Sequence, residues 1–166
     1  MGPTGALTRR PIGARLRAGV AGGAVASVVS GAPSTLHALV TGRSPIESVY
    51  AAGTLLPSMR ASGGSYAPDA RIDAVRGLVA HGMLSLGWGA LLGLGLPRRH
   101  PVLGGAAAGL AIAALDLGVV GRHLPRIRAL PAGPQVADHV AFGAVVGLVL
   151  SRSTTVPRRA RPARSA

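Results

Sequence analysis

Five polar side chains interrupt the apolar stretches of this sequence, and their types suit them to binding metals or moving protons. The five are His37, His81, Asp116, Asp138 and His139. Imidazole nitrogens and carboxylate oxygens are common ligands of divalent metals, and histidine can relay protons near neutral pH or hold a haem iron. The residue types alone therefore leave a metal site, a proton relay and a haem site open.

The spacing of these residues favours a simpler interpretation. No tight ligand motif such as HExxH is present, and Asp138 and His139 are adjacent, so their side chains diverge by about 100° around a helix. Glycine-rich neighbouring stretches leave little room for a haem macrocycle. We interpret the five residues as hydrogen-bonding groups between helices, for instance with Asp116 accepting from His81 or His139. A metal-binding or proton-relaying cluster is the alternative.

No pattern typical of an enzyme accompanies these residues. The sequence has no GxSxG, no GxxxxGK[ST] and no dinucleotide-binding GxGxxG between a strand and a helix. It also has no cysteine, so disulfides, thiolate nucleophiles and cysteine-ligated metals are excluded. We therefore predict a non-enzymatic protein without catalytic residues and without a cofactor.

The elements that must position the five residues are apolar stretches long enough to cross a bilayer. A hydrocarbon core about 30 Å thick needs roughly 20 mostly apolar residues in a helix. Four stretches reach or approach this length: 18–42, 77–96, 101–121 and 136–151. The sequence therefore predicts an all-α integral membrane bundle of four transmembrane helices in a domain at 18–151. Disordered basic tails are expected at 1–17 and 152–166.

The connections between the spans carry two further predictions. Within the loop 43–76, Ser44 and Glu47 have the spacing of a capping box, which predicts a short interfacial helix at 45–56 on the outer membrane surface. The loop 97–101 is so short that the second and third spans should form a tight antiparallel hairpin.

The arginines set the expected orientation. Eleven fall on the side of the two tails and the 97–101 loop, against seven on the opposite side. Because positive residues are enriched in cytoplasmic loops, both termini should lie in the cytoplasm. The five polar residues come late in the odd-numbered spans and early in the even-numbered ones, within roughly 8 Å of the extracytoplasmic face. A polar pathway would then stop halfway across the bundle, which argues against transport.

Small residues recur every four positions in each span, which predicts close helix packing in the absence of a hydrophobic driving force. These packing residues are Gly19, Gly23, Ser27, Gly31, Ser85, Gly89, Gly93, Gly105, Gly109, Gly143 and Gly147. Pro33 should kink or open the first span, because proline removes a helical hydrogen bond.

The net charge of +13 would by itself suggest nucleic acid as a partner, but only four aromatic residues are present and they cannot build a stacking platform. We assign the arginine excess instead to orientation in the lipid bilayer and to attraction of anionic lipid by the Arg-rich tails. No nucleic-acid partner is predicted.

Three stretches, at 31–56, 115–131 and 134–147, resemble small uncharacterised multi-pass membrane proteins of high-GC bacteria. In the first of them, RSPIESVYAAG is similar to YagU-type inner-membrane proteins. The resemblance implies a bacterial inner-membrane location and no established activity. We predict a structural or accessory subunit that forms homo-oligomers or joins other membrane subunits. A small transporter or a metal- or proton-binding membrane protein is the alternative.

Overall fold

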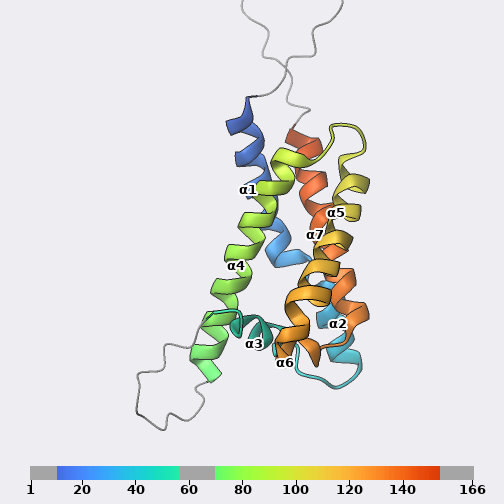
Figure 1. Cartoon of the computed structure of the whole chain (residues 1–166). Helices are drawn as coiled ribbons and strands as arrows, with labels where there is room; N and C mark the ends of the chain where they lie inside the picture. Colours follow the sequence, from blue (N-terminus) through green and yellow to red (C-terminus); the bar gives the residue numbers. More distant parts are fainter. Residues whose placement is uncertain (1–10, 57–69, 154–166) are drawn as a thin grey trace, which may run out of the picture.

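The structure, a computed structural model, describes residues 11–56 and 70–153, and every regular element in these residues is a helix (Figure 1). Four helical stretches in this part of the chain are long and apolar enough to cross a membrane: Ile12–Val40, Ala70–Gly95, Pro101–His123 and Ala132–Ser153. The prediction of an all-α bundle with four helices of membrane length is confirmed. The loop expected between the short helix and the second span falls largely at 57–69, outside the described residues.

The first and third stretches are divided into shorter elements. The first consists of α1 (Ile12–Val29) and α2 (Ala32–Val40), and the third of α5 (Pro101–Leu115), the π-helix η1 (Asp116–Val120) and the 3₁₀ helix η2 (Gly121–His123). The second and fourth are the single helices α4 (Ala70–Gly95) and α7 (Ala132–Ser153). Two short helices, α3 (Glu47–Gly53) and α6 (Pro125–Arg128), lie in the connections.

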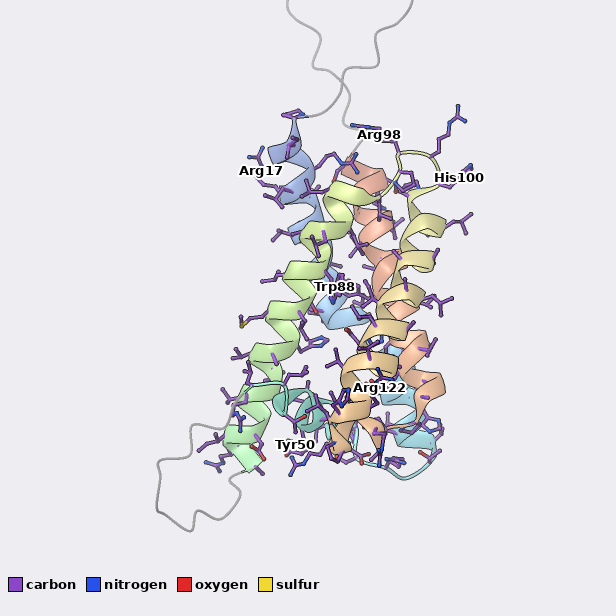
Figure 2. All side chains as sticks on the ribbon, in the orientation of Figure 1. Arg17, Tyr50, Trp88, Arg98, His100 and Arg122 are labelled. Atoms are coloured by element: carbon purple, nitrogen blue, oxygen red, sulfur yellow. The ribbon has the colours of Figure 1, made fainter. Side chains whose placement is uncertain are left out.

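Successive long helices run in opposite directions, so the bundle has two distinct ends (Figure 1). One end, here called the Arg98 end, holds the start of α1, the loop between α4 and α5, and the end of α7. The other, here called the α3 end, holds α3, η2 and α6. Figure 2 shows this arrangement through the labelled side chains, with Arg17, Arg98 and His100 at the first end and Tyr50 at the second.

The long helices associate as two pairs. Helix α1 packs along α4, and α5 packs along α7, while α1 also lies against α7 and so joins the pairs. The predicted tight hairpin of the second and third spans is wrong, because α4 and α5 hardly touch although a five-residue loop connects them. His100 ends that loop with a left-handed φ of 51° and begins α5. The glycine rows of α4 and α5 face α1 and α7, which explains the choice of partners.

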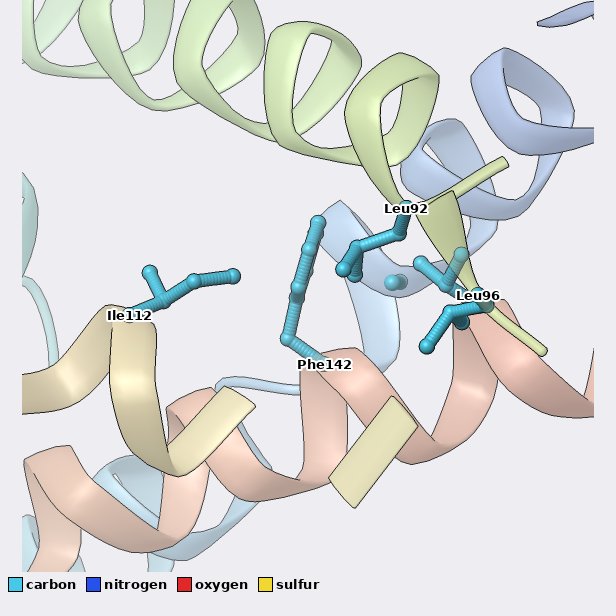
Figure 3. Packing of buried hydrophobic residues seen from close by; sticks show 6 residues of the cluster. Leu92, Leu96, Ile112 and Phe142 are labelled. Carbon is cyan, nitrogen blue, oxygen red and sulfur yellow. The ribbon is translucent and has the colours of Figure 1, made fainter. Parts of the chain in front are cut away.

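A small apolar core lies between the two pairs. It contains Ala26, Leu92, Leu96, Ile112, Phe142 and Val146, some of which Figure 3 shows at close range. Far more large apolar side chains point outward, among them Val28 at 81% exposure and Leu103 at 70%. Exposed apolar surface on this scale is unfavourable in water and favourable in hydrocarbon, so it suits a bundle with lipid as its solvent.

The helices extend beyond the predicted spans at both ends of the chain. Helix α1 begins at Ile12, so the prediction of a disordered tail at 1–17 is wrong for residues 12–17. Arg15 does not stop this helix, because its guanidinium donates to the carbonyl oxygens of Gly93 and Leu96 at 2.7 and 2.6 Å. It thereby satisfies carbonyls that the end of α4 leaves without helical partners. At the other end, α7 runs from Ala132 to Ser153, four residues earlier and two later than predicted.

The short helix of the first connection is shorter than predicted and starts differently. Helix α3 covers Glu47–Gly53 instead of 45–56, and its cap residue Ile46 makes no side-chain hydrogen bond to the backbone. The capping-box prediction is wrong because the Glu47 carboxylate pairs with Arg43 at 3.0 Å. Helix α3 also packs directly on α4, where Gly77 lies against the Val49 carbonyl. Two glycines at this crossing, Gly53 and Gly77, let the backbones approach.

Candidate functional site

The first membrane-length stretch is broken between α1 and α2. Helix α1 ends at Val29, Ser30 and Gly31 form a turn, and α2 starts at Ala32 with Pro33 in its first turn. Because proline lacks an N–H group and its ring crowds the preceding turn, it fits the start of a helix and not its interior. The break also rotates Gly31 out of the row of packing residues. Nothing lies within 4 Å of a Cβ atom built on it, so its predicted packing role is wrong.

Asp138 of α7 caps the exposed start of α2. The Ser34 backbone N–H donates to Oδ1 of Asp138 over 3.0 Å. This amide belongs to the first turn of α2, where backbone N–H groups have no helical acceptor. An anionic or hydrogen-bonding carboxyl at that position also interacts favourably with the helix dipole. One of the five predicted polar residues therefore stabilises a helix start inside the bundle.

Asp116 and His139 form a pair at the second irregularity. Asp116 begins the π-helix η1, and its Oδ2 lies 3.3 Å from Nε2 of His139 on α7. The other ring nitrogen of His139, Nδ1, lies 2.7 Å from the carbonyl oxygen of Gln135. The predicted contact between these two residues is present, and it ties α7 to η1.

The hydrogen bonds of this pair require two protons. A carbonyl oxygen only accepts, so Nδ1 of His139 must carry a hydrogen to donate to Gln135. The second proton must lie between Nε2 and the Asp116 carboxyl, on either group. Both arrangements, an imidazolium with a carboxylate or a neutral imidazole with a carboxylic acid, have no net charge. The pair is therefore neutral as a unit when both hydrogen bonds are made.

The two remaining histidines lie apart from this pair. The His81 Nε2 atom contacts the carbonyl oxygen of Ser27 at 3.0 Å, which links α4 to α1. Ser27 belongs to α1 and Ser34 to α2, so the His81 and Asp138 contacts lie on opposite sides of the helix break. His37 lines a small pocket at the α3 end. Asp116, Asp138 and His139 lie together at one part of α7, as expected, and the common level of His37 and His81 stays a prediction.

The five residues do not assemble into one metal centre. Within residues 11–56 and 70–153, no three His, Asp or Glu side chains are arranged so that they could hold a metal ion. Adjacent positions on α7 send Asp138 to α2 and His139 to η1, as the angular separation of neighbouring helical residues requires. Within the described residues, the arrangement joins helices to one another and lacks the ligand number of a structural metal site.

Glycines form the interfaces of both helix pairs. In the first pair, Gly19 and Gly23 of α1 lie against Ser85, Gly89 and Gly93 of α4. In the second, the contacts join Gly105 and Gly109 of α5 to Gly143, Gly147 and the His139 carbonyl of α7. A Cβ atom on any of these glycines would collide with the backbone of the partner helix. Apart from Gly31 and Ser27, the predicted packing residues therefore lie at these interfaces, and Ser27 contributes its carbonyl to His81.

Several residues of the site were not found from the sequence. The Ser34 amide and the Gln135 carbonyl are backbone groups, which residue types do not reveal. Gly22 packs against Val146 where α1 meets α7, with a Cβ atom built on it 3.2 Å from the Val146 Cα. Its position three residues after Gly19 was the available signal, because residues three apart share a helix face.

Comparison of the chain with protein-family models, with curated proteins and with solved structures finds no match. The four membrane-length helices and their packing into a bundle place the protein in the broad class of helical membrane bundles. The resemblance to YagU-type proteins stays a prediction.

Proposed function

We propose that this protein is a non-enzymatic structural or accessory subunit of the bacterial inner membrane. The observation that carries the proposal is that three polar side chains inside the bundle, Asp116, Asp138 and His81, all have partners within the chain. Each of these side chains contacts another helix of the same chain, at distances of 3.0–3.3 Å. Polar groups in hydrocarbon are retained where they bond to one another or to backbone, so these contacts are consistent with fixing the bundle.

The proposed orientation has both termini in the cytoplasm. The start of α1, the loop with Arg98 and Arg99, and the end of α7 share one end of the bundle (Figure 2). The arginines of these three segments were counted together in the sequence, and this grouping agrees with that count. Their total of eleven, against seven elsewhere, supports a cytoplasmic location for this end. The outward apolar surface would contact lipid or further membrane subunits, and the arginines would attract anionic lipid.

The broken helices favour a small transporter as the second candidate. Discontinuous membrane helices often form substrate sites, where half-helix ends face the bound ion or solute. Here the start of α2 faces Asp138 of the same chain, so the position that a substrate anion would take is filled. Backbone contacts at Gly105 and Gly143 also occupy the space that a path through the α5–α7 interface would need. These observations support the structural candidate over the transporter.

A double-mutant cycle on Asp116 and His139 tests the structural role. We expect Asp116→Asn and His139→Gln each to lower the free energy of unfolding in detergent, with a coupling energy of about 0.5–2 kcal/mol between them. The metal content of purified protein is measured on the same samples. A coupling energy near zero, or stoichiometric metal that is lost in His139→Gln, would contradict the proposal.

The accessory role has a separate test. After extraction in a mild detergent, light scattering on the size-exclusion peak gives the protein mass without the detergent. We expect a mass above that of one chain, from a homo-oligomer or from co-purifying membrane subunits. A monomer at every protein concentration would remove the accessory role and leave the structural role of the polar contacts untouched.

A further inference from the structure

The acidic residues of this chain are absent from the segments that meet at the Arg98 end. Glu47 begins α3 and Asp73 lies in the first turn of α4, both at the α3 end. Asp116 and Asp138 contact other helices inside the bundle, and Asp69 directly precedes α4 in the sequence. The segments 1–17, 97–101 and 152–166, whose described parts meet at the Arg98 end, contain eleven arginines and no acidic residue.

The arginines of the two ends also differ in their partners. At the α3 end, Arg43 pairs with Glu47 at 3.0 Å, and Arg126 pairs with Asp73 at 3.5 Å. At the Arg98 end, Arg15 is occupied by the carbonyls of α4. Four other arginines of this end are exposed and make no ion pair or hydrogen bond within the described residues: Arg17, Arg98, Arg99 and Arg152 (Figure 2). Their positive charge is not compensated by the described protein.

Exposed apolar side chains flank these arginines. Leu16 directly precedes Arg17 on α1, and Leu148 lies one helical turn before Arg152 on α7. Leu103 follows the loop of Arg98 and Arg99 in the first turn of α5, and it is also exposed. Cationic groups at the ends of apolar helices are typical of the boundary between hydrocarbon and water. A partner of this end therefore has to match positive charge and apolar surface together.

An anionic phospholipid meets both requirements. A guanidinium group binds phosphate oxygens through paired hydrogen bonds, and an apolar side chain next to it can contact acyl chains. Nucleic acid or an acidic protein segment would match the arginines and leave the exposed Leu103 and Leu148 without apolar contacts. The chemistry of this end thus favours a lipid over a soluble polyanion.

We propose that the Arg98 end binds anionic phospholipid in preference to the α3 end. The four exposed arginines hold the lipid phosphates, and the apolar side chains beside them contact the acyl chains. The inference rests on the membrane location proposed above and deepens it, because it assigns lipid binding to residues at helix ends and in a helix-connecting loop. In the proposed orientation the partner is a lipid of the cytoplasmic leaflet, whose surface is negatively charged.

Native mass spectrometry of the full-length protein tests the proposal. The chain is released from a neutral detergent after titration with phosphatidylglycerol or with phosphatidylcholine of the same acyl chains. Because one arginine near an anionic lipid surface strengthens binding roughly fivefold, we expect the first phosphatidylglycerol to bind at least about tenfold more tightly than the first phosphatidylcholine. Replacing both Arg98 and Arg99 with Gln should reduce this preference several-fold. Far-UV circular dichroism checks that the variant keeps its helices.

The matched control replaces Arg122 and Arg128 with Gln at the α3 end. Both are exposed and make no ion pair or hydrogen bond within the described residues, so the two double variants lose equal charge from equivalent surroundings. We expect the control to keep the lipid preference within about twofold, because acidic residues at the α3 end oppose an anionic lipid there. A second variant replaces four tail arginines with Gln: Arg158, Arg159, Arg161 and Arg164.

Four results would overturn the proposal. Equal affinity for the two lipids would remove the preference for an anionic headgroup, and equal losses in the two double variants would remove the preference for the Arg98 end. A loss in the tail variant alone would place the binding in the tail. Inorganic phosphate that binds as tightly as phosphatidylglycerol would remove the lipid as the partner. Each of these leaves the membrane location standing, which fails instead if alkaline washing without detergent extracts the protein from membranes.

Discussion

Gly89→Ala is the sharpest test of the glycine interface between α1 and α4. A Cβ atom at Gly89 would lie 2.6 Å from the Gly19 carbonyl oxygen and 2.7 Å from the Gly23 Cα, and both are backbone atoms of α1. Ordinary contact for such a methyl group begins near 3.4 Å. The helices must therefore separate by up to about 0.8 Å, a gap that forfeits a quarter to a half of the dispersion energy of each displaced contact.

The matched control is Gly87→Ala on the same helix. Nothing lies within 4 Å of a Cβ atom at Gly87, which is exposed. Both substitutions change helix propensity equally, so the difference between the two variants isolates the steric term. Overpacking a close interface typically costs about 1–3 kcal/mol, and we expect Gly89→Ala to be less stable than Gly87→Ala by that amount.

Reversible unfolding in mixed micelles, followed by far-UV circular dichroism as the fraction of denaturing detergent rises, measures this difference. Equal stability of the two variants within about 0.5 kcal/mol would refute the reasoning, because a steric cost that is specific to position 89 would then be absent. A loss in both variants would also count against it, since Gly87 has open space around it.

Three further predictions concern the cap of α2, the helix break at Gly31 and the orientation of the bundle. Asp138→Ala should lower the free energy of unfolding by about 1–3 kcal/mol, because the Ser34 amide loses its acceptor, and Asp138→Asn should cost less because its carbonyl still accepts; equal losses would contradict the capping role. Gly31→Ala should leave stability within about 0.5 kcal/mol of the unmodified chain, since it has open space, and a larger loss would restore Gly31 to the interface. In the cysteine-free chain, an impermeant maleimide applied from outside to intact cells should label Ser44→Cys and spare Arg99→Cys, and the reverse pattern would invert the orientation.

The sequence was sufficient for the four membrane-length helices and for most of the residues at their interfaces, because both follow from local patterns. Length and apolar character specify a span, and a four-residue recurrence specifies a face. Which helix that face meets is a different question. All four spans carry small residues at this recurrence, so the pairing of α1 with α4 and of α5 with α7 could not be deduced from any one of them. Loop length suggested α4 with α5, and the backbone fit of the glycine rows overrides it.

The polar residues were predictable in type and approximate level, and less so in their partners. Asp116 and His139 meet as expected. They lie on facing helices, where a carboxyl group and an imidazole find few other polar partners. Asp138 meets a backbone amide, which became available because Pro33 displaced the helix start. A search of the sequence for pairs of side chains cannot find a backbone N–H group that becomes available only where a helix is broken.

Asp138 and His139 show how one short segment of α7 can control both irregularities. Their side chains diverge around α7, so one reaches the start of α2 and the other reaches η1. A shift of α7 along its axis would weaken both contacts together, whereas the glycine seam at Gly143 and Gly147 resists that shift by backbone contact on the Arg98 side. The glycine-packed half of the helix therefore holds the register on which both polar contacts rely. Asp138→Ala should consequently also lower the coupling energy between Asp116 and His139, measured by repeating their double-mutant cycle in the Asp138→Ala background, and an unchanged coupling energy would contradict the shared register.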